Sequence, residues 1–339
     1  MLSSTSPQVS LRMRRPHAVG NIAPRMKHRS ILLADDMSYQ SITGQRRHLK
    51  QREYAGFLAS RLGDSIEVLH VEDPSELPFA KPVYRKTVIG LQSHRAAEHE
   101  HPGGSFQVPV SFKITPGNPV SEILKASRGK SAKKSGVEML LLGTHGRKGL
   151  SRLLLGSVAE EVIRHSAVPV MTIGPVAQHS RVKTLSAKAA ITLVVATDLG
   201  TNSRKAEDYA LKLALRLRAR VILVHSLYGA LHPVIQTSMS APGSAPGLTE
   251  LLDVLKREAV QDLRRKNQVF KKAGVKCEAI LADHGIRTAT VILKYLKTPT
   301  TFAVMGTHSR NAVVRAFLGS TVREVILSSP SPVITVASR

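Results

Sequence analysis

The sequence contains few of the residues that cross-link chains or stack on bases. One cysteine in 339 residues excludes an internal disulfide and is typical of a reducing compartment. Tryptophan is absent and aromatic residues make up 4% of the chain, so the cores must be aliphatic and a base-stacking binder of single strands is disfavoured. No apolar run approaches the roughly 20 residues of a membrane-spanning helix, and the N-terminus lacks the apolar core of a signal peptide. We therefore expect a soluble, cytoplasmic protein with no membrane span.

Acidic residues are also scarce, with 24 Asp and Glu against 49 Lys and Arg, a formal net charge of +25. This charge favours association with polyanions such as nucleic acid, an anionic membrane surface or nucleotides, but it also suits a surface that only keeps the protein soluble. Residues 1–28 carry basic side chains and no acidic one, which predicts a disordered basic tail. The Ser- and Arg-rich composition of this tail also fits an organelle transit peptide.

One stretch combines an apolar run, a glycine-bearing loop and the start of a helical pattern. The run Met139–Leu142 ends at Gly143, and Gly156 and Ser157 precede apolar residues at helical spacing. Glycines let backbone N–H groups approach a phosphate closely, and a helix start supplies unpaired donors and a partial positive charge. The stretch therefore predicts an anion-binding loop between a strand and a helix.

The same layout occurs a second time in the chain. Gly306 follows Gly143 by 163 residues, and Gly319 follows Gly156 by the same number. This agreement indicates two copies of one domain, which we place at residues 29–174 and 190–339 with a linker at 175–189. Each copy reads as β-α-β-α-β-α-β-α-β, which predicts an α/β fold with two tandem, doubly wound, open parallel sheets of five strands.

Both copies are expected to begin with a buried strand that ends in carboxylates. These strands are Ile31–Ala34, followed by Asp36, and Ile191–Ala196, followed by Asp198. Open α/β sheets bind ligands at the carboxyl ends of their strands, where an Asp can accept a hydrogen bond from a ribose hydroxyl or a base amino group. A strand-end acid that caps the next helix is the competing interpretation.

Further elements follow from apolar spacing and from capping residues. Ser203 is placed to cap the helix that follows Asp198. The longest helical pattern is Thr249–Lys272, with Gly274 suited to its C-terminal cap. Its apolar stripe comprises Leu251, Leu252, Leu255, Ala259 and Leu263. Its other face carries Lys256, Arg257, Arg264, Arg265 and Lys266. That basic face is either solvated or a contact for a polyanion.

Two other features are interpreted as structural. Cys277 lies on an expected strand with no recognisable base beside it, which favours a packed thiol over a nucleophile. The group His94, His99 and His101 matches no recognised metal-ligand spacing, so we expect a solvated loop and no metal site.

The pattern Gly-x-x-Gly, nine residues, Gly-Ser resembles the nucleotide-binding motif of the universal stress protein family. Gly143, Gly146, Gly156 and Ser157 complete it, whereas Ser309 replaces the middle glycine in the second copy. The resemblance implies an adenine nucleotide alpha hydrolase-like fold, a role in the stress response and ATP as ligand, with Mg²⁺ left open. It also implies that the copies pair as an intramolecular pseudo-dimer through Val170–Ile173 and Val333–Val336. A further homodimer stays open.

Residue by residue, the resemblance implies a nucleotide site in each copy. In the first copy the implied residues are Ala34, Asp36, Val71, Leu142, Gly143, His145, Gly146, Gly156, Ser157 and Val158. In the second copy they are Ala196, Asp198, Ser226, Met305, Gly306, His308, Ser309, Gly319, Ser320 and Thr321. Because Ser309 puts a side chain where the motif has none and Ser226 replaces an apolar residue, we expect the first site to be the better formed. Arg147, Lys148 and Arg152 are candidates for neutralising phosphate charge or for a solvated loop.

Several enzyme classes are disfavoured by missing motifs. The chain has neither the P-loop pattern Gly-x-x-x-x-Gly-Lys-[Ser/Thr] nor the serine-hydrolase pattern Gly-x-Ser-x-Gly. The glycine loop shows no carboxylate pair for a metal ion, which argues against fast phosphoryl transfer. We therefore assign no catalytic residue and expect at most slow ATP hydrolysis. The alternative function is an interaction protein whose basic surface engages nucleic acid or another acidic partner, with the glycine loop purely structural.

Overall fold

The computed structural model describes residues 29–36, 42–73, 106–128, 136–144, 155–179, 185–228, 248–282, 285–307 and 318–337. The N-terminal copy comprises β1 (Ser30–Ala34), α1 (Ile42–Leu62), β2 (Ser65–Glu72), β3 (Val110–Pro116), α3 (Pro119–Arg128), β4 (Val137–Gly143), α4 (Ser157–His165) and β5 (Val170–Ile173). A short helix, α5 (Pro175–His179), follows. The C-terminal copy comprises β6 (Thr192–Ala196), α6 (Thr201–Leu217), β7 (Arg220–Ser226), α8 (Leu248–Lys272), β8 (Cys277–Ala282), α9 (Thr288–Tyr295), β9 (Thr301–Gly306), α10 (Ser320–Ser328) and β10 (Val333–Val336).

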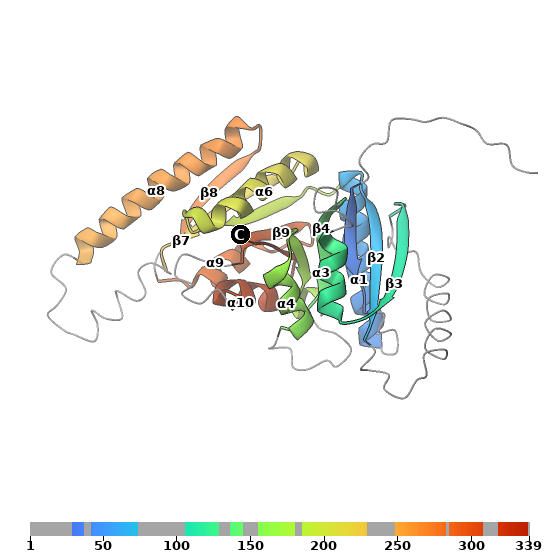
Figure 1. Ribbon diagram of the computed structural model, residues 1–339. Coiled ribbons are helices and arrows are strands. Elements are labelled where there is room, and N and C mark those ends of the chain that lie inside the picture. The colour runs from blue at the N-terminus through green and yellow to red at the C-terminus, as the bar shows by residue number, and fades with distance from the viewer. Residues whose placement is uncertain are drawn as a thin grey trace, which may run out of the picture.

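All ten of these strands form one continuous sheet, in the order β3-β2-β1-β4-β5-β10-β9-β6-β7-β8 (Figure 1). Within each copy the neighbouring strands are parallel, whereas β5 and β10 pair in antiparallel fashion at the centre of the sheet. The doubly wound α/β fold expected from the sequence is confirmed for both copies. The two five-stranded sheets join edge to edge through β5 and β10, the two strands through which the resemblance implied that the copies pair.

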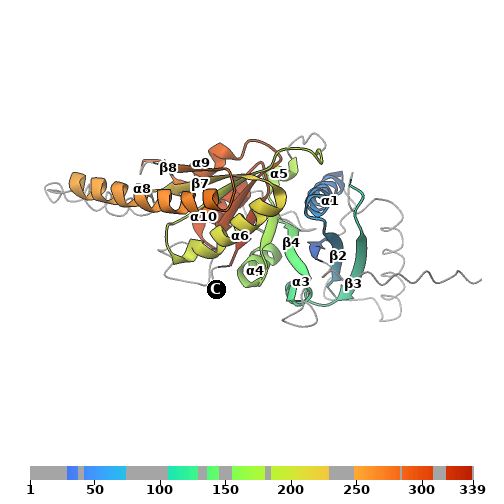
Figure 2. The same ribbon diagram turned by 90° about the horizontal axis from the view of Figure 1, so that it is seen from above.

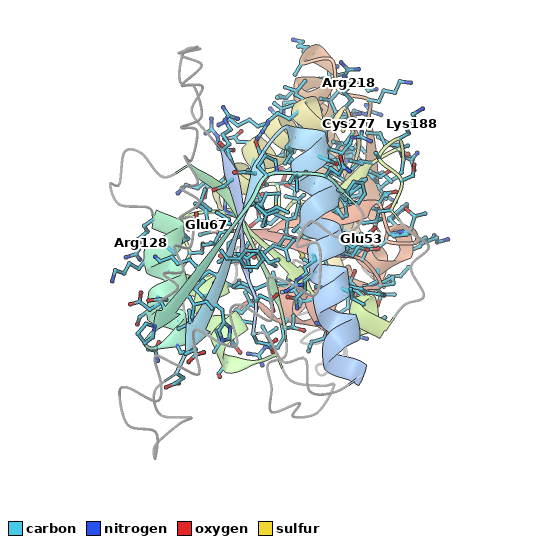
Figure 3. The ribbon with its side chains drawn as sticks, turned by 90° about the vertical axis from the view of Figure 1, so that its right-hand side faces the viewer. Glu53, Glu67, Arg128, Lys188, Arg218 and Cys277 are labelled. Carbon is cyan, nitrogen blue, oxygen red and sulfur yellow. The ribbon has the colours of Figure 1, made fainter. Side chains whose placement is uncertain are left out.

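Helices cover both faces of the sheet because its strands are apolar on both faces (Figure 2). On β1, Leu33 packs in the hydrophobic cluster under α1, α6 and α8, while Leu32 packs in the cluster under α3, α4, α9 and α10. Each cluster contains residues of both copies, so the core continues across the junction. Figure 3 shows α1, which carries Glu53, in front of this sheet. None of the described helices is long and apolar enough to cross a membrane.

The antiparallel junction relates the two copies by an approximate two-fold axis. Met171 pairs with Ile334, which is its equivalent 163 residues later. The contacts around this pair are reciprocal, because the Thr172 hydroxyl donates to the Val333 carbonyl at 3.1 Å and the Thr335 hydroxyl donates to the Val170 carbonyl at 3.2 Å. Each hydrogen bond from the N-terminal copy to the C-terminal copy thus has an equivalent that runs in the opposite direction.

Helices α1 and α6 repeat this reciprocity above the sheet. Arg61 donates to the carbonyl of Leu217 at 3.0 Å, and Arg216 donates to the carbonyl of Leu62 at 3.2 Å. Arg216 follows Arg61 by 155 residues, as Leu217 follows Leu62, so the two contacts are equivalent. Each helix end therefore satisfies a carbonyl of the other copy.

The linker expected at residues 175–189 stays a prediction, and it begins with α5, whose Ala177 is fully buried. Two local expectations need correction. The cap of α6 is Gly200 and not Ser203, which lies inside the helix and hydrogen-bonds Asp198 instead. On α8, Leu251 is 43% exposed, so the apolar stripe is buried only in its later part.

Two other expectations hold. Gly274 has a φ of +85° at the end of α8, the left-handed conformation that favours glycine there. The Cys277 thiol is buried, and this burial raises its pKa to about 11, as suits a packed side chain and not a nucleophile.

Candidate functional site

A pocket of about 280 Å³ opens at the carboxyl ends of β6, β7 and β9 in the C-terminal copy. Its walls come from these strand ends, from α8 and α9, and from the N-terminus of α10. Every described residue of the second predicted set lines it: Ala196, Asp198, Ser226, Met305, Gly306, Gly319, Ser320 and Thr321. His308 and Ser309 lie outside the described residues. Residues spread over more than a hundred positions of sequence thus surround one cavity.

Asp198 contributes one structural oxygen and one unsatisfied oxygen to this pocket. Its Oδ1 accepts from the Gly200 N–H at 2.8 Å and from the Ser203 hydroxyl at 2.6 Å, which orders the start of α6. Its Oδ2 is buried and has no hydrogen-bond partner among the described residues. Buried acceptors are normally satisfied, so this oxygen is suited to a donor supplied by a ligand. Asp198 does not make a side-chain capping bond to α6, whose N-cap is Gly200, and its role as a ligand acceptor stays a prediction.

The glycine loop of each copy is closed at its base by the same hydrogen bond. The Gly156 N–H donates to the Thr144 carbonyl at 2.8 Å, and the Gly319 N–H donates to the Thr307 carbonyl at 3.1 Å. Gly319 is the N-cap of α10 and makes no side-chain capping bond. The first turn of α10 therefore offers backbone donors where Ser320 lines the pocket, as an anion site requires.

Helix α8 supplies pocket residues that the sequence-based set does not contain. Leu255, Glu258, Ala259 and Asp262 line the cavity, at the spacing of one helical face. Leu255 and Ala259 give an apolar wall, and Glu258 and Asp262 add two carboxylates. The repeat could not indicate them, because the motif is confined to strand ends and the glycine loop.

A histidine at the end of the second strand is a further feature that both copies share. The ring Nδ1 of His225 lies 2.8 Å from the Thr197 carbonyl, and that of His70 lies 2.7 Å from the Asp35 carbonyl. A carbonyl only accepts, so Nδ1 carries the proton in both rings. His225 lines the pocket. The sequence offered one indication that the two histidines are equivalent, namely their separation of 155 residues.

A buried polar network lies beside the pocket and connects α8 to α6. Glu207 accepts from the Thr197 hydroxyl through Oε1 at 2.5 Å, and the same Oε1 lies 3.0 Å from the Ser203 hydroxyl oxygen. Its Oε2 accepts from the Lys266 ammonium at 2.6 Å. Because Lys266 belongs to α8, this pair holds the pocket-lining helix against the strand end that carries Asp198.

The N-terminal copy brings the same strand ends together. Ala34 neighbours Leu142 in the β1–β4 register, and β2 places Val71 at the same edge of the sheet. Gly156, Ser157 and Val158 start α4, with Ser157 exposed and Val158 37% exposed. His145, Gly146, Arg147, Lys148 and Arg152 lie outside the described residues, as do His94, His99 and His101.

Gly143 has a packing role that the motif did not indicate. A Cβ at this position would lie 2.2 Å from the Gln51 side-chain nitrogen and 3.4 Å from that of Gln178. The glycine therefore admits two amide side chains from α1 and α5. Beside it, Asp35 is buried and forms an ion pair with Arg52 at 3.0 Å, with both side chains 1% exposed.

Among the residues that the structure describes, no group of three or more His, Cys, Asp or Glu side chains is arranged to hold a metal ion. The carboxylates of Asp198, Glu258 and Asp262 line one pocket without forming such a group. The cavity thus combines the unsatisfied Oδ2 of Asp198 with the N-terminus of α10.

Comparison with known proteins finds two curated relatives that match part of the chain. Universal stress proteins MJ0531 and MJ0577 of Methanocaldococcus jannaschii are 36% identical over 66 residues and 40% identical over 68 residues. These matches cover 20% and 19% of this chain, and 36% and 39% of the relatives, so they span well under half of each relative's length.

Two solved structures share the fold over nearly the whole chain. A universal stress protein from Archaeoglobus fulgidus DSM 4304 has a TM-score of 0.58 at 20% identity, covering 91% of this chain and 96% of that one. Protein PA1789 of Pseudomonas aeruginosa PAO1 has a TM-score of 0.51 at 15% identity, covering 91% and 92%. The model of the universal stress protein family matches residues 29–174 and again residues 192–337. The chain therefore belongs to the universal stress protein family and carries its domain twice.

Proposed function

We propose that this protein binds an adenine nucleotide at the carboxyl ends of its strands, in the C-terminal pocket and at the equivalent place in the N-terminal copy. The observation that carries the proposal is the convergence of the motif residues on one cavity that holds the unsatisfied Asp198 oxygen. Membership of the family supports it. In this binding mode Asp198 accepts from the base or the ribose, and the start of α10 receives the phosphates.

The ligand expected from the resemblance is ATP, with or without Mg²⁺. Isothermal titration of the full chain with ATP, with and without Mg²⁺, tests the proposal directly. We expect saturable binding at up to two sites, one lost in Asp198→Asn and one in Asp36→Asn. Asp253→Asn is a matched control, because this exposed residue of α8 does not line the pocket. Absence of heat at millimolar nucleotide rejects the proposal.

The ranking of the two sites stays a prediction. The sequence favours the N-terminal copy, since it keeps Gly146 where the C-terminal copy has Ser309. The pocket described above belongs to the C-terminal copy. The two aspartate variants decide between them, because the variant that removes the tighter binding event identifies the better site.

We further propose a regulatory role in the stress response, in the cytoplasm, with hydrolysis of ATP slow or absent. Mass spectrometry of small molecules released from the denatured purified protein would identify the physiological ligand. Release of ADP over hours that is lost in His145→Ala would instead indicate a hydrolase. We also propose that the paired copies act as an intramolecular pseudo-dimer in solution.

A second candidate function rests on the basic face of α8. Lys256, Arg257 and Arg264 are exposed on this helix, in a chain with a net charge of +25. Such a face suits nucleic acid or another acidic partner. A gel-shift series tests it: phosphate-driven binding must weaken steeply as salt rises and must fall in Arg257→Ala/Arg264→Ala.

A further inference from the structure

We propose that the junction surface of the N-terminal copy is built to accept the C-terminal copy and to reject a second N-terminal copy, and that Glu160 and Arg323 make this distinction. This inference rests on the pairing of β5 with β10 and is independent of nucleotide binding. It concerns which domains pair. The N-terminal copy pairs with the C-terminal copy of the same chain, and not with the N-terminal copy of a second chain.

The argument starts from the approximate two-fold axis. Because Met171 pairs with its own equivalent Ile334, a pair of identical domains joined in the same way would place each position near the axis opposite itself. A side chain that is attracted to the equivalent residue of the other copy can repel an identical side chain at the same position of a second, identical copy. The two copies can therefore encode a preference for each other through differences at such positions.

Glu160 and Arg323 are the clearest of these differences. Arg323 follows Glu160 by 163 residues, so the two occupy equivalent positions, on α4 and α10. The Arg323 guanidinium donates to the Glu160 carboxylate across the junction, and their side chains are 36% and 19% exposed. Two N-terminal copies would bring Glu160 to Glu160, and two C-terminal copies would bring Arg323 to Arg323. Attraction in one pairing thus becomes repulsion in both others.

Gly174 adds a steric difference at the same junction. A Cβ on Gly174 would lie 1.9 Å from the backbone carbonyl oxygen of Ile326 in α10. The equivalent position 163 residues later is Ala337, which has a Cβ. A pair of C-terminal copies would place Ala337 against Ile326, where the observed packing leaves room only for glycine.

The ion pairs of Arg216 add an electrostatic difference that disfavours a pair of C-terminal copies. It contacts Asp64 at 2.9 Å and Glu138 at 3.3 Å, both in the N-terminal copy. The positions equivalent to these acids in the C-terminal copy are Ala219 and Thr301. A pair of C-terminal copies would therefore lose both ion pairs, whereas the observed pairing keeps them.

Charge reversal in the full chain tests the role of Glu160 and Arg323. We expect Glu160→Arg and Arg323→Glu each to lower the urea midpoint, and Glu160→Arg/Arg323→Glu to recover most of the loss. Glu161→Arg is the matched control, because Glu161 makes its ion pairs within its own helix, with Arg164 and His165. A double variant no more stable than the singles, or a Glu160→Arg loss equal to that of the control, overturns the assignment of these two residues.

A thiol trap tests the choice of partner without relying on stability. In a Cys277→Ser background, Met171→Cys/Ile334→Cys places two thiols at directly opposed strand positions, whose separation permits a disulfide. We expect this variant to form a disulfide within one chain on oxidation. Met171→Cys alone should stay a single chain on a non-reducing gel. A dimer linked through position 171 in that single variant would show that like domains pair, and would overturn the proposal.

Discussion

Arg52 and Glu207 stand at the same position of α1 and α6, 155 residues apart, and carry opposite charges. Arg52 holds the buried carboxylate of Asp35 at 3.0 Å. Glu207 holds the Thr197 hydroxyl and the Lys266 ammonium. Each pairing lies next to the strand end that carries the candidate ligand acid. The two copies thus share the same backbone arrangement, but the side chain that anchors the strand end is positively charged in the N-terminal copy and negatively charged in the C-terminal copy.

The first prediction concerns the buried ion pair in the N-terminal copy. Arg52→Leu should lower the free energy of unfolding by about 3–5 kcal/mol, because it leaves the buried Asp35 carboxylate without its guanidinium. Asp35→Asn/Arg52→Leu should recover part of the loss. Urea denaturation followed by circular dichroism measures both. Arg128→Ala, at an exposed arginine labelled in Figure 3, should change little. Equal losses in Arg52→Leu and Arg128→Ala would contradict the assigned role.

The second prediction concerns the α8 carboxylates in the C-terminal pocket. Glu258→Lys should tighten ATP binding roughly tenfold at low salt, since it turns a charge on the pocket wall that repels the anionic nucleotide into one that attracts it. Adenosine affinity should change far less. Asp253→Lys makes the same change in net charge on the same helix but outside the pocket lining, so it should leave ATP affinity nearly unchanged. Equal effects of the two variants would show that only the overall charge matters.

The third prediction contrasts two glycines that face different neighbours. Gly174→Ala should destabilise the protein by about 1–3 kcal/mol or more, because the new methyl group meets the Ile326 backbone carbonyl, which cannot move aside. Gly143→Ala should be milder, because its obstacle is the end of the Gln51 side chain, which can rotate away. Gly143→Ala/Gln51→Ala should be milder still. Thermal unfolding of the three variants gives the order, and a reversed order would refute the packing argument.

The fourth prediction is a pH dependence that arises from Lys50. Burial lowers the pKa of this lysine from 10.5 to about 8, and its ammonium donates to the Ala177 carbonyl at 2.8 Å. Between these two pKa values the unfolded chain binds more protons than the folded one, so the contribution of Lys50 to stability rises with pH. Compared with Lys50→Met, the wild type should therefore gain stability between pH 7.5 and pH 9.5. Lys212→Met, at an exposed lysine, should show no such trend against the wild type.

The repeat and the apolar runs predicted most of the fold. The strands Val170–Ile173 and Val333–Val336, through which the resemblance implied that the copies pair, are present as β5 and β10. The predicted helix Thr249–Lys272 differs from α8 by one residue. These strands and this helix could be predicted because each produces a local spacing of apolar residues that is visible in the sequence. The C-cap at Gly274 was predictable for the same reason, since a single residue supplies the needed conformation.

What the sequence did not reveal depends on contacts between distant segments. Ser203 has the chemistry of a cap, but in the fold its hydroxyl has better partners in Asp198 and Glu207. Glu258 enters the pocket only because α8 packs across the strand ends, which no local pattern records. The Arg323 contact with Glu160 likewise appears only when the two copies are placed about their axis.

The antiparallel meeting of β5 and β10 reverses the direction of every strand from one half of the molecule to the other. The strand termini that carry Asp36 and those that carry Asp198 consequently emerge on opposite margins of the shared sheet. The two positions are therefore separated by the junction, which is crossed by the β5–β10 ladder and by side-chain contacts such as that of Arg323 with Glu160. The two proposed sites would therefore open on opposite edges of one sheet, each accessible without the other.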